Sequence, residues 1–175
     1  MGDTLITIVA IALAAILMFV FPLMTMSDRT DDVSQLSVET STTEFVDDVR
    51  TTGKLTLDKY EKFAQSIAAT GNTYDIDMEV KVLDENPGKK SAQAVNSRIG
   101  ENVYYSEYTS QIMQELTNNN QKQKKLKEGD IFSTSVRNTN ETISQQLKNF
   151  FYKVSGNDSY TIAAEHAGIV TATGK

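Results

Sequence analysis

The chain begins with an apolar run that decides how the remainder can be arranged. Residues 4–27 contain no Asp, Glu, Lys or Arg, and residues 5–26 read LITIVAIALAAILMFVFPLMTM. A helix of about 20 apolar residues crosses a bilayer core of roughly 30 Å, and a helix satisfies its backbone hydrogen bonds within one segment. We therefore expect residues 1–26 to form a single transmembrane anchor that holds the protein at the cell membrane.

Three alternatives fit this run less well. A cleaved signal peptide has a basic start and a small-x-small cleavage site, whereas this chain starts Met1-Gly2-Asp3 and continues after the apolar core as Leu23-Met24-Thr25-Met26. A surface-lying amphipathic helix needs a polar face, which the run lacks. The core helix of a globular protein would rarely stay uncharged for so long. Charge leaves the orientation in the membrane open, because Arg29 is the only basic residue near the run.

Two features within the run predict its shape and its contacts. Pro22 removes one backbone donor and collides with the carbonyl four residues earlier, so we expect a bend between Met18 and Pro22. Ala10 and Ala14 lie four residues apart on one helix face. Helices associate inside a bilayer through close packing of small residues, so we expect this face to contact like subunits.

The rest of the chain is polar and acidic. The 175 residues carry a formal net charge of −6, which disfavours binding to the phosphate backbone of nucleic acids. One basic cluster, at Lys122, Lys124, Lys125 and Lys127, is predicted to be a solvated loop or a frayed helix end, with contact to anionic lipid or a partner as the alternative. The chain has no Cys, so disulfides and thiolate metal ligands are excluded.

Residue spacing predicts alternating helices and strands after the anchor. We expect a helix over residues 28–52 that ends at Gly53, a helix capped by Thr56 that closes at Gly71, and a strand over residues 74–82. A turn follows at Asn86-Pro87-Gly88, and Gly129-Asp130 and Gly156-Asn157-Asp158 mark two further turns. Each expected element has an apolar face. In the helix over residues 28–52 this face is Val33, Leu36, Phe45, Val46 and Val49, and two later helices have the faces Tyr105, Tyr108, Ile112, Met113 and Leu116, and Ile143, Leu147, Phe150, Phe151 and Val154. Two later strands have the faces Phe132, Thr134 and Val136, and Tyr160, Ile162, Ala164 and His166.

These elements predict an α+β protein. An N-terminal transmembrane helix (residues 1–26) continues into a polar helical stalk (27–53), and a head domain (54–175) consists of a small antiparallel sheet packed with helices. We predict that Tyr104, Tyr105 and Tyr108 lie in the core of the head domain rather than in a binding surface.

The residues needed for catalysis are largely missing. His166 is the only histidine, and it lies in a predicted strand of small residues. The spacing of Asp75, Asp77 and Glu79 is that of a calcium loop, but Val80 occupies the position where such a loop needs Gly, so we interpret these carboxylates as a solvated sheet face. We therefore expect no enzyme activity, no metal, no cofactor and no small-molecule substrate.

Two short segments resemble those of a known family. Residues 2–6, Gly2-Asp3-Thr4-Leu5-Ile6, resemble the processing region of type IV pilin-like proteins, although Thr7 stands where that family has Glu and no basic leader precedes Gly2. The segments Thr70–Ile76 and Gly129–Ile131 resemble the TadE-like pseudopilins of Gram-positive bacteria. The resemblance implies processing near Gly2 and Asp3, an extracytoplasmic head, and an N-terminal helix that packs against other pilin-like proteins.

The leading hypothesis is therefore a structural pilin-like or pseudopilin-like subunit of a surface appendage or secretion apparatus. The alternative is a single-pass membrane accessory protein of a conjugation-type apparatus, with an extracytoplasmic binding domain.

Overall fold

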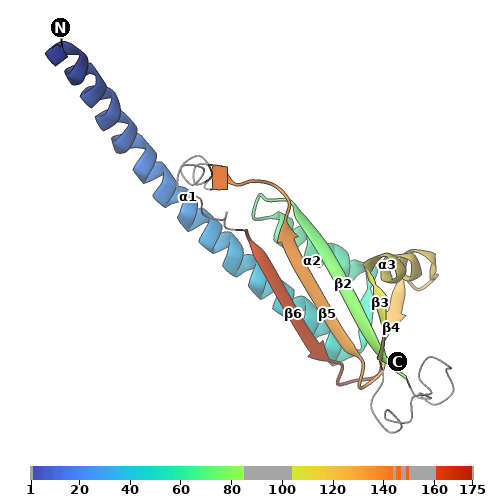
Figure 1. Ribbon diagram of the computed structural model, residues 1–175. Helices are drawn as coiled ribbons and strands as arrows, with labels where there is room; N and C mark the ends of the chain where they lie inside the picture. The colour runs from blue at the N-terminus through green and yellow to red at the C-terminus, as the bar shows by residue number, and fades with distance from the viewer. Residues whose placement is uncertain (1, 85–103, 144, 147–148, 150–160, 175) are drawn as a thin grey trace, which may run out of the picture.

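The structure, a computed structural model, describes residues 2–84, 104–143, 145–146, 149 and 161–174. In these described residues, three helices and six strands form an α+β fold, as predicted (Figure 1). In chain order they are α1 (Gly2–Thr52), β1 (Lys54–Thr56), α2 (Leu57–Ala68), β2 (Tyr74–Leu83), β3 (Tyr104–Tyr108), α3 (Thr109–Asn118), β4 (Gln123–Lys125), β5 (Ile131–Asn138) and β6 (Ala163–Ile169).

Helix α1 is 51 residues long and continues through Pro22. Its C-terminal half is rich in Thr, a mediocre helix former, because the Thr hydroxyl competes for backbone hydrogen bonds. Here the hydroxyls donate to carbonyls one turn earlier, as Thr42 does to Val38 O at 2.7 Å and Thr43 to Glu39 O at 2.9 Å. The bend predicted between Met18 and Pro22 stays a prediction.

Gly53 ends α1, as the sequence predicts. Its φ of +64° lies in the left-handed region that favours glycine, and its N–H donates to Val49 O at 2.8 Å. A Cβ at this position would stand 2.1 Å from the carbonyl oxygen of Ala172. Glycine is therefore needed both for the turn and for the close passage of the C-terminal segment.

Helix α2 follows strand β1 and returns antiparallel to α1, so that its start lies beside Asp48 and its end beside Val33. Its N-cap is Thr56, as predicted, whose hydroxyl accepts from Lys59 N at 3.2 Å. Phe63 and Ile67 are its buried residues. Gly71, at φ +84°, then turns the chain into β2.

The main sheet is four-stranded and antiparallel, in the order β3-β2-β5-β6. β2 pairs with β5 along eight residues, from Tyr74↔Asn138 to Lys81↔Ile131. The predicted alternation of β2 is confirmed, because Met78 and Val80 are buried while Asp75 and Asp77 are exposed. A second, two-stranded sheet joins β1 to β4.

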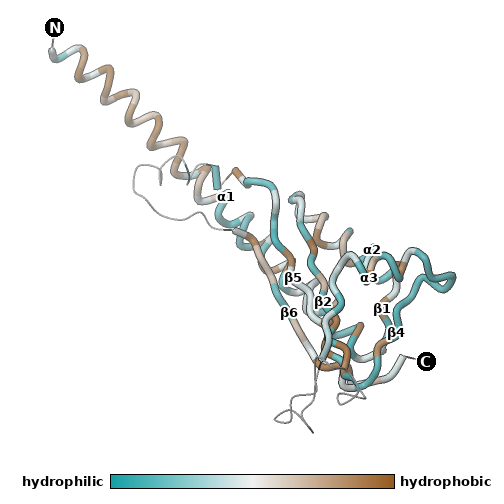
Figure 2. The backbone as a smooth tube through the Cα atoms, turned by 45° about the vertical axis from the view of Figure 1, so that its right-hand side comes forward, coloured by the Kyte–Doolittle hydropathy of each residue, from teal (hydrophilic) through white to brown (hydrophobic). Residues whose placement is uncertain are grey.

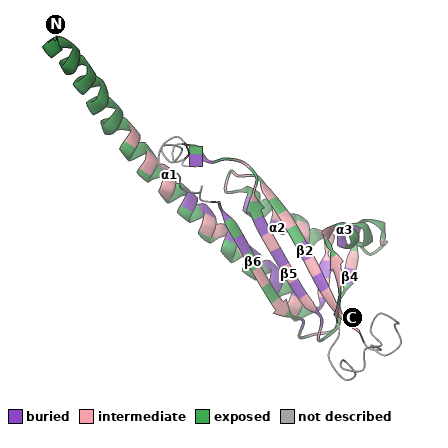
Figure 3. Ribbon diagram, viewed as in Figure 1, coloured by how far each residue is buried: buried purple, intermediate pink, exposed green. Residues whose placement is uncertain are grey.

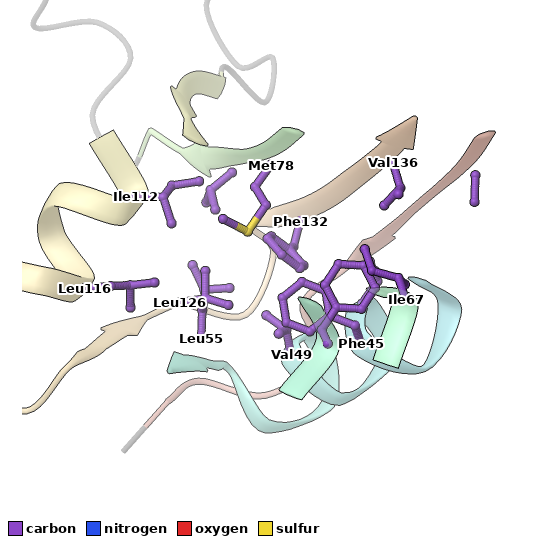
Figure 4. Close-up of a cluster of buried hydrophobic side chains, with 14 of the residues drawn as sticks. Phe45, Val49, Leu55, Ile67, Met78, Ile112, Leu116, Leu126, Phe132 and Val136 are labelled. Carbon is purple, nitrogen blue, oxygen red and sulfur yellow. The ribbon is translucent and has the colours of Figure 1, made fainter. Parts of the chain in front are cut away.

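The core lies between one face of this sheet and helices α1 and α2 (Figure 4). The Phe45 ring of α1 stacks on Phe63 of α2, with centroids 4.4 Å apart, and meets Phe132 of β5 edge-on at 5.7 Å. Val46 and Val49 are fully buried in the same cluster. Residues of the predicted stalk thus contribute to the core of the head.

The face predicted for this part of α1 is wrong at two residues. Val33 and Leu36 are 68% and 65% exposed, although we grouped them with Phe45. The buried face instead runs through Asp31, Ser34, Val38 and Thr42 before reaching Phe45. An apolar pattern misses such a face because its polar members are buried with partners of their own.

The predicted helix containing Tyr105 and Tyr108 is also wrong at its start. Tyr104–Tyr108 is strand β3, and helix α3 begins only at Thr109. Tyr105 and Tyr108 are 42% and 59% exposed, so they are not core residues. Ile112 and Leu116 are fully buried, as predicted.

The basic cluster is a solvated loop only at its two ends, where Lys122 and Lys127 are exposed and lie outside regular secondary structure. Gln123–Lys125 forms strand β4, antiparallel to β1. Lys124 is only 6% exposed. The sequence pattern misses this because burial of a lysine depends on carboxylates that are distant in sequence.

The final strand is confirmed over Ala163–Ile169, with Ala164 and the preceding Ile162 buried. Several predictions lie outside the described residues: the turns at Asn86–Gly88 and Gly156–Asp158, Tyr160, and the part of the predicted fourth helix that carries Leu147, Phe150, Phe151 and Val154.

Candidate functional site

The candidate site is the N-terminal half of α1, which projects beyond the head (Figure 1). Figure 2 shows it as mostly apolar, and Figure 3 shows it as mostly exposed. None of its most apolar 18-residue window is buried, and α1 is long and apolar enough to cross a membrane. Phe19 and Met18 are each 73% exposed. Isolated soluble proteins rarely expose so large a contiguous apolar surface, so this half of α1 needs a lipid or protein environment.

The sequence-predicted site residues all lie on this segment. Ala10 and Ala14 are exposed and separated by one turn, so their methyl groups are open to a second helix. Pro22 is exposed within the helix. Gly2 and Asp3 lie in its first turn, where the negative charge of Asp3 interacts favourably with the positive end of the helix dipole. The backbone carbonyl of Asp3 accepts from the Thr7 hydroxyl at 2.8 Å.

A polar contact that the sequence does not reveal lies where the exposed half of α1 meets the head. Asp31 is 5% exposed, and its Oδ2 accepts from the Thr142 hydroxyl at 2.7 Å. Thr142 and Gln145 also bond reciprocally, each backbone N–H donating to the other's side chain. Asp31 therefore ties α1 to the segment that follows β5.

The edge strand β6 is tied to α1 in a similar way. The Gln35 amide donates from Nε2 to Ala163 O at 2.7 Å and accepts at Oε1 from Ala163 N at 3.0 Å. One side chain thus reproduces the two hydrogen bonds of a strand partner. Further along, His166 Nε2 lies 3.7 Å from Asp47 Oδ1. The only histidine is accordingly a residue of the α1–β6 packing.

At the far end of the head, Lys124 lies between two carboxylates. Its Nζ lies 2.5 Å from an oxygen of Glu107 in β3 and 2.5 Å from one of Glu115 in α3. Burial by itself would lower the pKa of this ammonium group, but the hydrogen bonds and charges of Glu107 and Glu115 outweigh it and raise the pKa. The three residues fasten the small sheet to β3 and α3.

The outer face of the main sheet bears a shallow groove of about 450 Å³. Asp77, Glu79 and Glu165 contribute carboxylates to it, and Ser133 and Ser135 contribute hydroxyls. No group of three His, Asp or Glu residues is placed to hold a metal ion within the described part of the chain. The interpretation of Asp75, Asp77 and Glu79 as a polar sheet face agrees with this geometry.

No protein-family model, curated protein or solved structure matches the chain. The features that bear on function are therefore those of the chain itself.

Proposed function

We propose that this chain is a membrane-anchored structural subunit of a surface appendage or secretion apparatus, pilin-like or pseudopilin-like in type. The N-terminal half of α1 is its single-pass anchor and its contact with other subunits, and the head stands outside the cytoplasm. The observation that carries this proposal is the continuity of α1 from Gly2 to Thr52. The same helix exposes an apolar half, uncharged from Thr4 to Ser27, and contributes part of the head's core with its other half.

Such continuity favours a structural role over a tethered binding domain. A tethered domain works well on a flexible linker, which lets it search for its ligand. Here no Pro- or Gly-rich linker separates residues 26 and 31, and Asp31, Val38 and Phe45 already pack against the head. The head can therefore transmit force to the anchor, as a subunit of an assembly must. The likeness of Gly2–Ile6 to the pilin processing region adds support.

The test is a pair of substitutions at Ala14 in cells that express the neighbouring genes. Ala14→Phe would prevent close approach of a second helix, whereas Ala14→Gly preserves it. We expect Ala14→Phe to reduce the amount of protein recovered in the mechanically sheared surface fraction or co-purified assembly at least fivefold, with Ala14→Gly close to the native chain.

The fold of the head serves as the control, because Ala14 is exposed and far from the core. Equal thermal melts of both variants in detergent would show that assembly alone had changed. If the native chain stays monomeric in the membrane and neither variant alters its distribution, the single-pass accessory protein becomes the better description.

A further inference from the structure

Two adjoining pockets lie where the apolar half of α1 meets the head. One, of about 630 Å³, is a groove between α1 and the end of α2. The other, of about 340 Å³, lies between α1, the turn after α2 and the segment after β5. Thr30 and Thr70 line both, so the two pockets meet at these residues. We call them the arginine pocket and the aspartate pocket, because Arg29 lines the first and Asp31 lines the second.

The aspartate pocket contains a buried carboxylate with few partners. Asp31 is 5% exposed, and within the described chain its side chain has one hydrogen bond, which Oδ2 accepts from the Thr142 hydroxyl at 2.7 Å. No ion pair joins it to a described Lys, Arg or His. A buried carboxylate is costly unless a cation or several donors satisfy it. Because Oδ1 is left without a donor, this pocket favours a cationic ligand that carries N–H groups.

An ammonium group fits the aspartate pocket better than a metal ion does. Calcium takes six to eight oxygen ligands, and no group of three His, Asp or Glu is placed to hold a metal among the described residues. An ammonium group needs only about three acceptors. Asp31 supplies one, Asn72 Oδ1 accepts a single hydrogen bond from Asn140 and so has room for another, and the exposed Glu141 stands at the rim.

The arginine pocket carries the opposite charge. Arg29 supplies a guanidinium group, whose fork of N–H donors matches the oxygens of a phosphate. Ser34 is 4% exposed and lines the same groove, and its hydroxyl forms no hydrogen bond with another described residue. The Thr70 hydroxyl, by contrast, already donates to Ile67 O at 2.8 Å. Since buried hydroxyls are normally satisfied, the free donor of Ser34 points to an anionic ligand beside Arg29.

Both pockets lie at the depth of the lipid headgroups when the apolar run spans a bilayer. Arg29 and Asp31 follow Met26, the end of the run, by about 4.5 Å and 7.5 Å along the axis at 1.5 Å per residue. The headgroup layer on each side of the hydrocarbon core is about 5–7.5 Å deep. Headgroups are therefore the charged groups closest to these pockets.

We propose that the two pockets together bind the headgroup of one phosphatidylethanolamine molecule, with its phosphate in the arginine pocket and its primary ammonium group in the aspartate pocket. Phosphatidylglycerol has the phosphate but no cation, and the trimethylated nitrogen of phosphatidylcholine has no N–H to donate to Asp31. The site thereby selects among lipids of the same tail length. The inference shares with the proposed function only the insertion of α1 in a membrane.

Native mass spectrometry of the full-length protein tests this site. The protein is purified in mild detergent, stripped of lipid and mixed with dilauroyl phosphatidylethanolamine, phosphatidylcholine or phosphatidylglycerol at equal concentrations. The tails are identical, so differences in the fraction of protein that carries one lipid come from the headgroup. We expect at least fivefold more bound phosphatidylethanolamine than phosphatidylcholine, with phosphatidylglycerol between them. Equal binding of the first two, or phosphatidylglycerol binding as strong as phosphatidylethanolamine, would overturn the proposal.

Asp31→Asn tests the ammonium half. Its amide oxygen can still accept from the Thr142 hydroxyl, so the head stays folded while the charge is lost. The ratio of bound phosphatidylethanolamine to phosphatidylcholine should fall to about one. Asp32→Asn, at the exposed adjacent position, is the matched control and should keep the native ratio. A native ratio in Asp31→Asn, or an equal loss in both variants, would refute the role of Asp31.

Two variants test the phosphate half. Arg29→Gln and Ser34→Ala should each lower the binding of phosphatidylethanolamine and phosphatidylglycerol by the same factor, at least threefold for Arg29→Gln. Ser34→Ala removes a hydroxyl without a partner among the described residues, so the thermal melt of the head should not change. Lys125→Gln, an exposed cation in β4, should leave lipid binding unchanged. A loss confined to phosphatidylethanolamine would contradict the placement of the phosphate beside Arg29.

The lipid site and the proposed function can fail separately, because lipid binding is measured on purified protein. Selective binding of phosphatidylethanolamine without assembly in cells refutes the proposed function alone. Assembly in cells by a chain that does not distinguish the three lipids refutes the lipid site alone.

Discussion

The two halves of α1 differ in what surrounds them. Residues 2–19 are exposed on every side and uncharged beyond Asp3, whereas between Asp31 and Val49 one face is buried in the head. The first half is almost entirely apolar, and none of its residues is buried. The second is polar on most of its outer face, apart from Val33 and Leu36, and packs against α2, β5 and β6.

The two halves of α1 are therefore stabilised as helix in different ways. The first half consists largely of Leu, Ile, Ala and Met, and only an apolar environment would offset its exposure. The second half contains many Thr and Ser residues, and short helices of such composition are marginal in water. It is held by the stacked Phe45 and Phe63 rings and by side chains such as Gln35 that bond to the sheet. Substitutions matched across the two halves can break or sharpen this contrast.

The largest effect is expected from truncating the aromatic core of the second half. Phe45→Ala removes the stacking on Phe63 and the edge contact with Phe132, and a Phe→Ala change in a core costs about 3–5 kcal/mol. Phe19→Ala, at a side chain 73% exposed, should change the free energy of unfolding by less than about 0.5 kcal/mol. Chemical denaturation of both full-length variants in detergent measures the difference. A comparable loss in both would mean that the first half packs against the head.

A smaller effect is expected at the junction of the two halves. Asp31→Ala removes the acceptor of the Thr142 hydroxyl and leaves a buried polar group without its partner, at a cost of about 1–3 kcal/mol. The neighbouring Asp32 is exposed, and Asp32→Ala should stay within about 0.5 kcal/mol of the native chain. Thermal melts of these two variants show where along α1 its contacts with the head begin to contribute to stability. Equal melting temperatures would place that boundary further along α1.

Alkaline pH should weaken the head and leave the first half of α1 unaffected. The pKa of Lys124 is raised above its usual 10.5 by Glu107 and Glu115 in spite of burial, and that of Tyr60 is raised above 10.0 by burial and by Asp75. A folded-state pKa above the unfolded value gives stability that is complete below the unfolded pKa and is lost as pH rises through the folded one. Both groups therefore predict declining stability from about pH 10 upwards.

Denaturation of the head at pH 8 and at pH 11 tests this decline. Lys124→Met should show a shallower loss of stability between the two pH values, because its charge is already gone. Lys125→Met, at the exposed neighbouring position, should keep the native slope. Identical slopes in all three proteins would remove Lys124 from the explanation.

Patterns that depend on one segment were predictable from the sequence. The β2 alternation, the Thr56 cap and the stop at Gly53 each follow from local chemistry, and each is confirmed. The apolar run likewise identified the candidate site, since its composition needs no tertiary context. Each of these features is caused by residues that are close to one another in the sequence.

Features that depend on distant partners were missed. Lys124 is buried only because Glu107 and Glu115 converge on it, and Asp31 only because Thr142 lies against it. Tyr104–Tyr108 forms a strand because it pairs with the distant strand β2, which the apolar spacing of this segment does not reveal. The exposure of Val33 on α1 is of the same kind, because it depends on which face of the helix the head covers.

Deletion of residues 1–26 removes far more of the chain than any single substitution, yet we expect it to change the stability of the head least. No residue of the core cluster precedes Val38, and the first buried side chain, Asp31, is retained. The truncated chain should therefore be soluble without detergent, and its head should melt within a few degrees of the full chain, because no apolar contact of the core is lost. Two longer deletions test how far the helix can be shortened. Deletion to residue 32 removes Asp31 and should melt lower, and deletion to residue 46 removes Phe45 and Val46 and should not fold. Aggregation of the first truncation under conditions in which the full chain stays soluble without detergent would show that the apolar half belongs to the head and is not an anchor.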